Sequence, residues 1–127
     1  MLLFPTAGKQ LSLEMIVNRR APEDLLLKLF SNDITPSDSD IASSFTEPTS
    51  QEYEPFVLTE WGAAVGEAIE HPLRVFQGQL GNVYGYFVVQ SKSGGLLYAE
   101  RFPDGPYNMI NRRDEVEVTP RISAPKS

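Results

Sequence analysis

Few side chains in this sequence are suited to acid–base or metal chemistry. The chain has one histidine, His71, and no cysteine. A serine–histidine–acid arrangement would need His71 as its base, but no serine lies in a nucleophile-elbow pattern. A zinc site needs three or four Cys, His or carboxylate ligands. We therefore expect His71 to be a surface or packing residue in a protein that is not an enzyme, with no catalytic residue and no metal site.

Carboxylates in one polar segment are the remaining ligand candidates. Asp33, Asp38 and Asp40 fall within residues 31–51, and hard cations such as calcium prefer oxygen ligands. Their spacing is not that of an EF-hand loop, and no glutamate closes it, so turn-forming and solvated roles are favoured while cation binding stays open. The glycines match neither a phosphate-binding loop nor a dinucleotide fingerprint, so we expect no cofactor.

Charge and hydropathy limit the classes of partner. The 127 residues carry a formal net charge of −6, which opposes binding to nucleic-acid phosphates. The basic pairs Arg19-Arg20 and Arg112-Arg113 are more typical of solvated or ion-paired clusters. No apolar run approaches the roughly 20 residues that span a bilayer, and residues 1–4 are too short for a signal-peptide core. We expect a soluble protein made in the cytosol that binds neither nucleic acid nor membrane.

Hydrophobic patterning predicts a mainly β fold. Leu25, Leu27 and Leu29 alternate along one predicted strand, and Val116 and Val118 point inward from another. Glycine- and proline-containing turns separate about six or seven short antiparallel strands, which favours a small β-sandwich or a barrel-like domain. The predicted strands cover residues 25–30, 56–59, 73–76, 83–90, 96–102 and 115–122.

The N-terminal region departs from the β pattern. Residues 1–8 read as an extended apolar arm, and residues 9–18 form either a short helix or a strand, with Leu13, Ile16 and Val17 on one helical face. Residues 31–51 are a long surface loop anchored by Ile34, Ile41 and Phe45, and residues 62–71 are ambiguous. The expected organisation is an arm with a short helix over 1–20, a sandwich-like domain over 21–122 and a mobile tail over 123–127.

Aromatic residues gather in the C-terminal half and suggest a surface. Tyr84 and Tyr86 would share one strand face with Val88, and Tyr107 follows a turn. Such a stripe suits a core face, a subunit interface or a sugar-stacking platform, and these three alternatives stay open. The candidate interface residues are Leu3, Phe4, Tyr84, Tyr86 and Tyr107.

Several segments together resemble a family of small virion structural proteins of tailed bacteriophages, cyanophages among them. The segments are GNVYGYFVVQ (81–90), GGLLYAERFPDGPYNM (94–109), DEVEVTPRI (114–122), IVNRRAPEDLLLKLFSNDITPSDSD (16–40) and SFTEPT (44–49). Tyr98 stands where that family usually has tryptophan, and residues 62–72 fit its pattern poorly. The resemblance therefore covers most of residues 16–122.

This resemblance implies a capsid decoration, or cement, protein located on the capsid surface of the virion. Such a protein would form a homotrimer of β-folds and bind the major capsid protein. It would stabilise the phage head by burying apolar area across subunit boundaries. The alternative is a tail-tip or tail-fibre-associated module that binds host surface glycans. An exposed tyrosine beside carboxylates in a groove would favour this alternative.

Overall fold

The structure, a computed structural model, describes residues 2–3, 5–17, 23–63, 65–66 and 68–123. It confirms a mainly β, antiparallel fold with one short N-terminal helix. The elements are β1 (Leu2–Leu3), α1 (Thr6–Ile16), β2 (Leu25–Phe30), β3 (Phe56–Leu58), β4 (Ala68–Glu70), β5 (Arg74–Gln77), β6 (Gly81–Val83), β7 (Gly85–Gln90), β8 (Leu96–Arg101), β9 (Tyr107–Met109), β10 (Glu115–Val118) and β11 (Arg121–Ser123), with a 3-10 turn at Ala42–Ser44.

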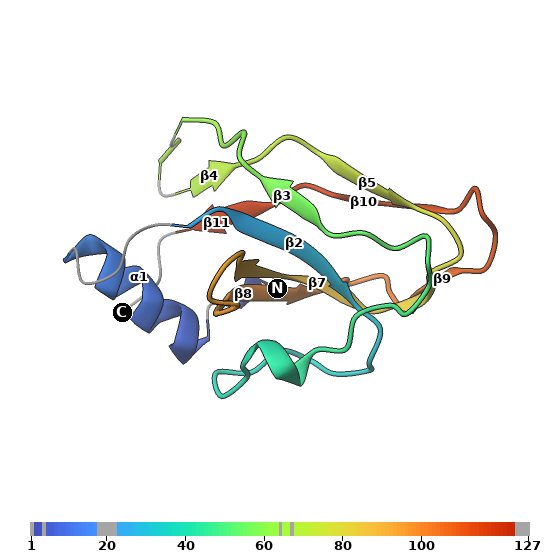
Figure 1. Ribbon diagram of the computed structural model, residues 1–127, viewed down its shortest axis with the longest axis horizontal. Helices are drawn as coiled ribbons and strands as arrows, with labels where there is room; N and C mark the ends of the chain where they lie inside the picture. The colour runs from blue at the N-terminus through green and yellow to red at the C-terminus, as the bar shows by residue number, and fades with distance from the viewer. Residues whose placement is uncertain (1, 4, 18–22, 64, 67, 124–127) are drawn as a thin grey trace.

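The strands form two layers. One layer is a five-stranded sheet in the order β1-β8-β7-β2-β3, and three two-stranded ribbons, β10-β5, β11-β4 and β6-β9, complete the fold. Figure 1 shows β5–β10 and β4–β11 along one side of the five-stranded sheet and α1 at one end. The central strands β2 and β7 carry the longest apolar runs because both of their faces are covered. In the described ranges the sheets stay open and no barrel closes.

Both faces of the five-stranded sheet are packed. Toward the ribbons, Leu27, Leu29 and Val88 are fully buried in a cluster that also contains Phe76 of β5 and Val116 of β10. Val116 and Val118 point inward as predicted, and Leu25 lies at the margin of this cluster. The opposite face carries a smaller cluster, which the long loop covers. Its buried members are Phe30, Phe45, Phe87, Val89, Leu96 and Ala99.

The long loop is fixed by Phe45. The ring of Phe45 stacks on Phe87 with centroids 4.9 Å apart and contacts Phe30 at 5.0 Å. Of the other predicted anchors, Ile34 is half-buried, but Ile41 is 55% exposed. Ile41 as an anchor was therefore a wrong prediction, because the 3-10 turn that begins beside it directs only Ala42 toward the cluster.

The predicted strand over 83–90 is interrupted at Tyr84. Residues up to Val83 belong to β6, which pairs with β9, while β7 begins at Gly85 and pairs with β2 and β8. The backbone N–H of Tyr84 donates to Phe30 O at this crossing. Strand β6 also begins before the predicted strand, since Gly81 and Asn82 pair with Met109 and Asn108.

The predicted strand over 115–122 is likewise two strands. Pro120 has no N–H for a ladder, and the chain changes partner there, from β5 to β4. The carbonyl of Pro120 instead accepts the N–H of His71 at 2.9 Å. The ambiguous segment 62–71 contributes only the short strand β4.

The helix begins within the predicted arm, directly after Pro5. Gly8 lies against β8 so closely that a Cβ added there would stand 1.8 Å from the carbonyl oxygen of Leu97. Leu11, one turn later, is buried on the same face. In the described part of the chain, no helix combines the length and apolarity needed to cross a bilayer.

Some predictions concern residues that are not described. These are the Arg19-Arg20 pair and most of the predicted C-terminal tail, since residues 18–22 and 124–127 lie outside the described ranges. Ser123, the first residue of that tail, ends β11 instead.

Candidate protein-binding surfaces

Tyr86 belongs to the core and not to a surface. Its side chain is 4% exposed, and its hydroxyl donates to Glu100 Oε1 at 2.8 Å. Burial, together with the nearby Tyr98 and Glu100, holds the pKa of Tyr86 far above its ordinary value. Tyr86 was therefore wrongly predicted as an interface residue, because the face that it shares with Val88 packs against the ribbons.

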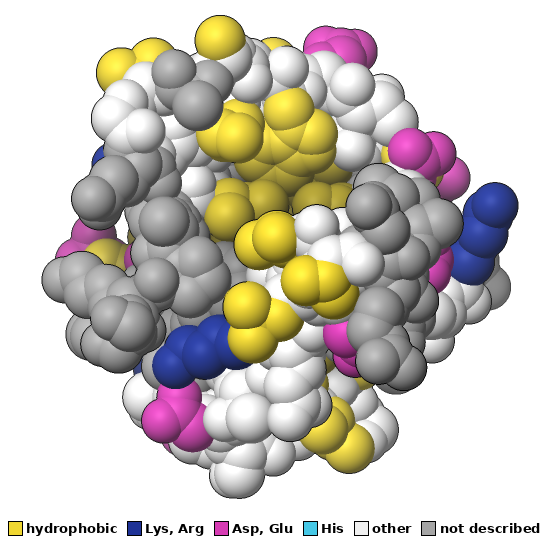
Figure 2. All heavy atoms as spheres, turned by 90° about the vertical axis from the view of Figure 1, so that its left-hand side faces the viewer, with side chains coloured by type: hydrophobic (Ala, Val, Ile, Leu, Met, Phe, Trp, Pro, Cys, Tyr) yellow, Lys and Arg dark blue, Asp and Glu magenta, His cyan; other side chains and the backbone are white. Residues whose placement is uncertain are grey.

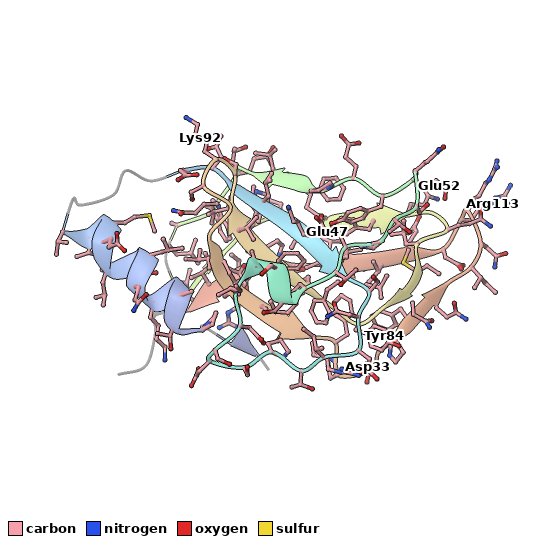
Figure 3. All side chains as sticks on the ribbon, turned by 60° about the horizontal axis from the view of Figure 1, so that its bottom comes forward. Asp33, Glu47, Glu52, Tyr84, Lys92 and Arg113 are labelled. Carbon is pink, nitrogen blue, oxygen red and sulfur yellow. The ribbon has the colours of Figure 1, made fainter. Side chains whose placement is uncertain are left out.

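Tyr84 lies on the other side of the five-stranded sheet. Its ring is half-buried beside the Phe30 and Phe87 cluster, and the guanidinium of Arg101 sits 5.2 Å from its centroid. Arg101 also forms an ion pair with Asp33 at 2.7 Å, and Figure 3 shows Tyr84 and Asp33 close together. The prediction that Tyr84 and Tyr86 share a face was wrong, because the chain changes sheets at Tyr84.

The other candidate interface residues do not join these tyrosines. Tyr107 is half-buried in β9, with its ring 5.0 Å from that of Phe102. Leu3 belongs to β1, where its backbone pairs with Ala99, and Phe4 lies outside the described residues. The three tyrosines thus form no continuous exposed platform. Of the three, Tyr107 lies beside carboxylates in a pocket of about 310 Å³ that Glu115, Val116 and Glu117 also line.

His71 is a buried packing residue. Its ring is edge-on to Trp61 at 5.2 Å, and the side chain is 1% exposed. Nε2 accepts the backbone N–H of Glu60 at 3.0 Å, which leaves the ring proton on Nδ1 to be donated to the carbonyl of Pro72 at 3.0 Å. Both ring nitrogens are therefore occupied by backbone groups.

The acidic loop residues serve separate structural contacts. Asp33 pairs with Arg101, and Asp40 accepts the backbone N–H of Ser37, three residues earlier, at 2.7 Å, which closes a local turn. No group of three or more His, Cys, Asp or Glu side chains able to hold a metal ion occurs within the ranges that the structure describes.

Helix α1 presents an apolar face to solvent. Leu13, Ile16 and Val17 are 62%, 75% and 61% exposed, although they share one face at helical spacing. The opposite face, with Gly8 and Leu11, packs against β8. Because that packing fixes the orientation of the helix, the side chains of Leu13, Ile16 and Val17 point away from this chain's own core.

A groove runs beside this helix. It has a volume of about 510 Å³ and lies between α1, the 3-10 turn and the loop joining β7 to β8. Its lining includes Gln10, Leu11, the exposed Ile41 and Leu96. Figure 2 views this end of the molecule and shows apolar side chains gathered on it. This groove borders a different face of α1 from the one that carries Leu13, Ile16 and Val17, and we call these three residues the α1 surface.

The helical spacing in the sequence indicates that this surface exists, but not that it is exposed. The spacing of Leu13, Ile16 and Val17 indicates a common face, but that face would ordinarily be assigned to the core. Gly8 and Leu11 are three residues apart, which is also helical spacing, and a glycine inside a helix is a sign of close backbone approach. Only the contact of Gly8 with β8 decides which of the two faces is buried.

Comparisons with known proteins give no assignment. No protein-family model matches the chain, and neither the curated proteins nor the solved structures include a significant match.

Proposed function

We propose that this chain is a structural protein of a phage particle, a capsid decoration protein that stabilises the shell through protein–protein contacts. The resemblance in sequence supports the kind of particle. The exposed apolar face of α1 supports the mode of action, and it is the observation that carries the proposal.

The α1 surface has the energetic properties of a docking element. Burying an aliphatic side chain of this size contributes about 1.5–3 kcal/mol, so Leu13, Ile16 and Val17 together offer a large driving force for association. The helix is held in place by Gly8 against Leu97 and by Leu11. A surface that is ordered before binding loses less conformational entropy when it docks.

One helix is too small for a stable interface by itself. Specific interfaces bury about 1,600 Å² in total, which is more than three side chains provide. Repetition of the contact by symmetry, as in the homotrimer that the resemblance implies, multiplies it at each copy. We therefore propose that the α1 surface contacts the major capsid protein or a neighbouring copy of this chain.

The glycan-binding alternative has weaker support. A sugar platform needs exposed aromatic rings close to one another, whereas Tyr86 is buried and Tyr84 is partly covered by Arg101. Tyr107 lies beside Glu115 and Glu117 in a pocket, but it is half-buried and, among the described residues, is the one aromatic side chain in that lining. We therefore favour the decoration role over a tail-tip or tail-fibre module.

The test compares particles that carry different forms of this chain. Particles without the chain, with the wild type and with L13Q/I16Q/V17Q would be heated, and release of DNA would be followed by dye fluorescence. We expect the triple variant to bind particles at least about tenfold more weakly and to leave them as heat-sensitive as particles that lack the chain. The matched control is I110Q, which removes a side chain that is 60% exposed. Ile110 directly follows β9, which Figure 1 shows at the end of the molecule away from α1. Equal heat resistance of particles with and without the wild-type chain would contradict the proposal.

A further inference from the structure

A second groove, lined by apolar side chains, separates β3 from β5. Its volume is about 490 Å³, and Phe56, Phe76 and Leu80 contribute to its lining. The rings of Phe56 and Phe76 meet edge-on at 4.8 Å, so the floor of the groove is closed by packed core side chains. Val57 and Val75, which are 51% and 37% exposed, also line it.

Both walls of the groove are strand edges. Within the described residues β3 pairs with β2 only, and β5 pairs with β10 only. The groove therefore lies between two sheet edges that have no strand partner on the facing side. Exposed edges of this kind are the sites at which a further strand can add.

The register shows which backbone groups face the groove. The N–H of Leu29 points to the β3 side of β2, where it donates to the Tyr53 hydroxyl. Residues two apart in a strand direct their backbone groups the same way, so those of Leu27 and Leu25 also face β3. They form hydrogen bonds with Phe56 and Leu58. Alternation then turns the N–H and C=O of Val57 away from β2. On β5, Gly78 donates to Asp114 in the direction of β10, which turns the backbone groups of Val75 and Gln77 away from β10.

Val57 of β3 and Val75 and Gln77 of β5, whose backbone groups are turned away from their strand partners, all line the groove. An extended segment seated there would pair with the backbone groups of Val57 at the usual strand spacing of about 4.8 Å and lie beside Val75 and Gln77. Its alternate side chains would point down onto Phe56 and Phe76 and out toward the rim.

Charge at the rim selects the occupant. Among the described residues that line the groove, Glu52 and Glu54 carry charge, and none is lysine or arginine. The exposed Glu115 and Glu117 lie across the β5–β10 ribbon from Gln77 and Val75. Arg112 pairs with Glu52 at 3.7 Å, whereas no ion pair to Glu54, Glu115 or Glu117 occurs within the described ranges. Figure 3 shows Glu52 near the end of the molecule that also carries Arg113.

We propose that this groove binds an extended, positively charged segment of a partner protein by strand addition between β3 and β5. Apolar side chains of the segment would cover the aromatic floor, and its lysines or arginines would meet the carboxylates at the rim. The inference goes beyond the decoration role because it names the chemistry of the bound segment, and it does not require that the particle be a phage head.

The test uses a defined probe and the full chain. A fluorescein-labelled seven-residue peptide that alternates lysine and valine would be titrated with the protein, and anisotropy would report binding. Backbone amide shifts in the protein would locate it, and we expect the largest changes at Val57, Val75 and Gln77. The same peptide with glutamate in place of lysine should bind at least about tenfold more weakly.

Two variants separate the backbone and charge contributions. V57P removes an N–H that faces the groove and leaves the β2–β3 ladder intact, so we expect a folded protein with at least about tenfold weaker binding. V57A keeps that N–H and should bind the peptide within about threefold of wild type. E54K should weaken binding, whereas D104K, with the same change in net charge in an exposed turn, should not.

Three results would overturn the inference. These are no saturable binding of the lysine peptide to wild type, equal binding to a folded V57P, or amide shifts away from the groove. Because the heat-release test of the decoration role depends on α1 variants, either proposal can fail without the other.

Discussion

The phenolic oxygen of Tyr53 accepts the backbone N–H of Leu29 at 3.2 Å and, in turn, donates to Glu47 Oε1 at 2.7 Å. This contact replaces a missing strand partner. Strand β3 begins at Phe56, which pairs with Leu27, so the β2–β3 ladder ends before it reaches Leu29. The Tyr53 side chain, from the loop before β3, thereby provides the acceptor for the backbone N–H of Leu29, a residue whose side chain is fully buried.

Removing that hydroxyl should destabilise the fold. Tyr53→Phe leaves the Leu29 N–H without its acceptor, and we expect the free energy of unfolding to fall by about 1–2 kcal/mol. Urea denaturation followed by circular dichroism measures the change. Tyr107→Phe is the control, because no hydrogen bond to its hydroxyl occurs within the described ranges, and it should alter stability by less than about 0.5 kcal/mol. Equal effects of the two changes would show that the Tyr53 contact contributes nothing.

Stability should fall at alkaline pH. Burial, and then the hydrogen bond to Glu47, raise the pKa of Tyr53, while burial chiefly raises the pKa of Tyr86. Because the unfolded tyrosines ionise near pH 10 and the folded ones resist ionisation, the contribution of these two tyrosines to stability is constant below that pH. Above it, stability decreases by up to about 1.4 kcal/mol per pH unit for each tyrosine.

Urea midpoints measured between pH 8 and pH 11.5 would show this decline. Tyr53→Phe should make the alkaline slope shallower, since one of the contributing groups is gone. An unchanged slope in that variant would mean that Tyr53 ionises equally in the folded and unfolded states.

Replacing Gly8 by alanine should destabilise the protein, although alanine ordinarily favours a helix. In an exposed helix, Gly→Ala stabilises by about 1 kcal/mol, but here the added methyl would stand 1.8 Å from the Leu97 carbonyl oxygen. We expect Gly8→Ala to destabilise by about 1–3 kcal/mol, as overpacking does. Thermal unfolding measures this, with Gln10→Ala at an exposed position of the same helix as the control. A Gly8→Ala protein more stable than wild type would mean that α1 does not rest on β8.

The outward face of α1 should matter little for folding. We expect L13Q/I16Q/V17Q to change stability by less than about 0.5 kcal/mol per site, because all three side chains are mostly exposed. By contrast Leu11→Ala, on the buried face, should cost about 2–3 kcal/mol. Urea unfolding of the two variants makes the comparison. A triple variant as unstable as Leu11→Ala would place this face in the folding core and remove the basis for an interface there.

The candidate surfaces were only partly predictable from sequence. A shared face for Leu13, Ile16 and Val17 follows from their spacing, and an interface built on Tyr86 was wrong because its strand face is covered by the ribbons. The groove between β3 and β5 had no local signal. Its walls are about twenty residues apart in the chain and belong to different sheets.

Local sequence determined β2, β3, β5 and β8 to within about one residue at each end, and the burial of Leu27, Leu29, Val116 and Val118, because side-chain period and turn residues act within a few residues. Tertiary structure decided where Tyr84 and Pro120 transfer the chain from one partner strand to another, since those pairings join residues that are remote in sequence. It also decided which face of α1 packs against β8. The backbone of Leu97 lies against Gly8, and this close approach, which the hydrophobicity of the helix does not specify, sets the buried face.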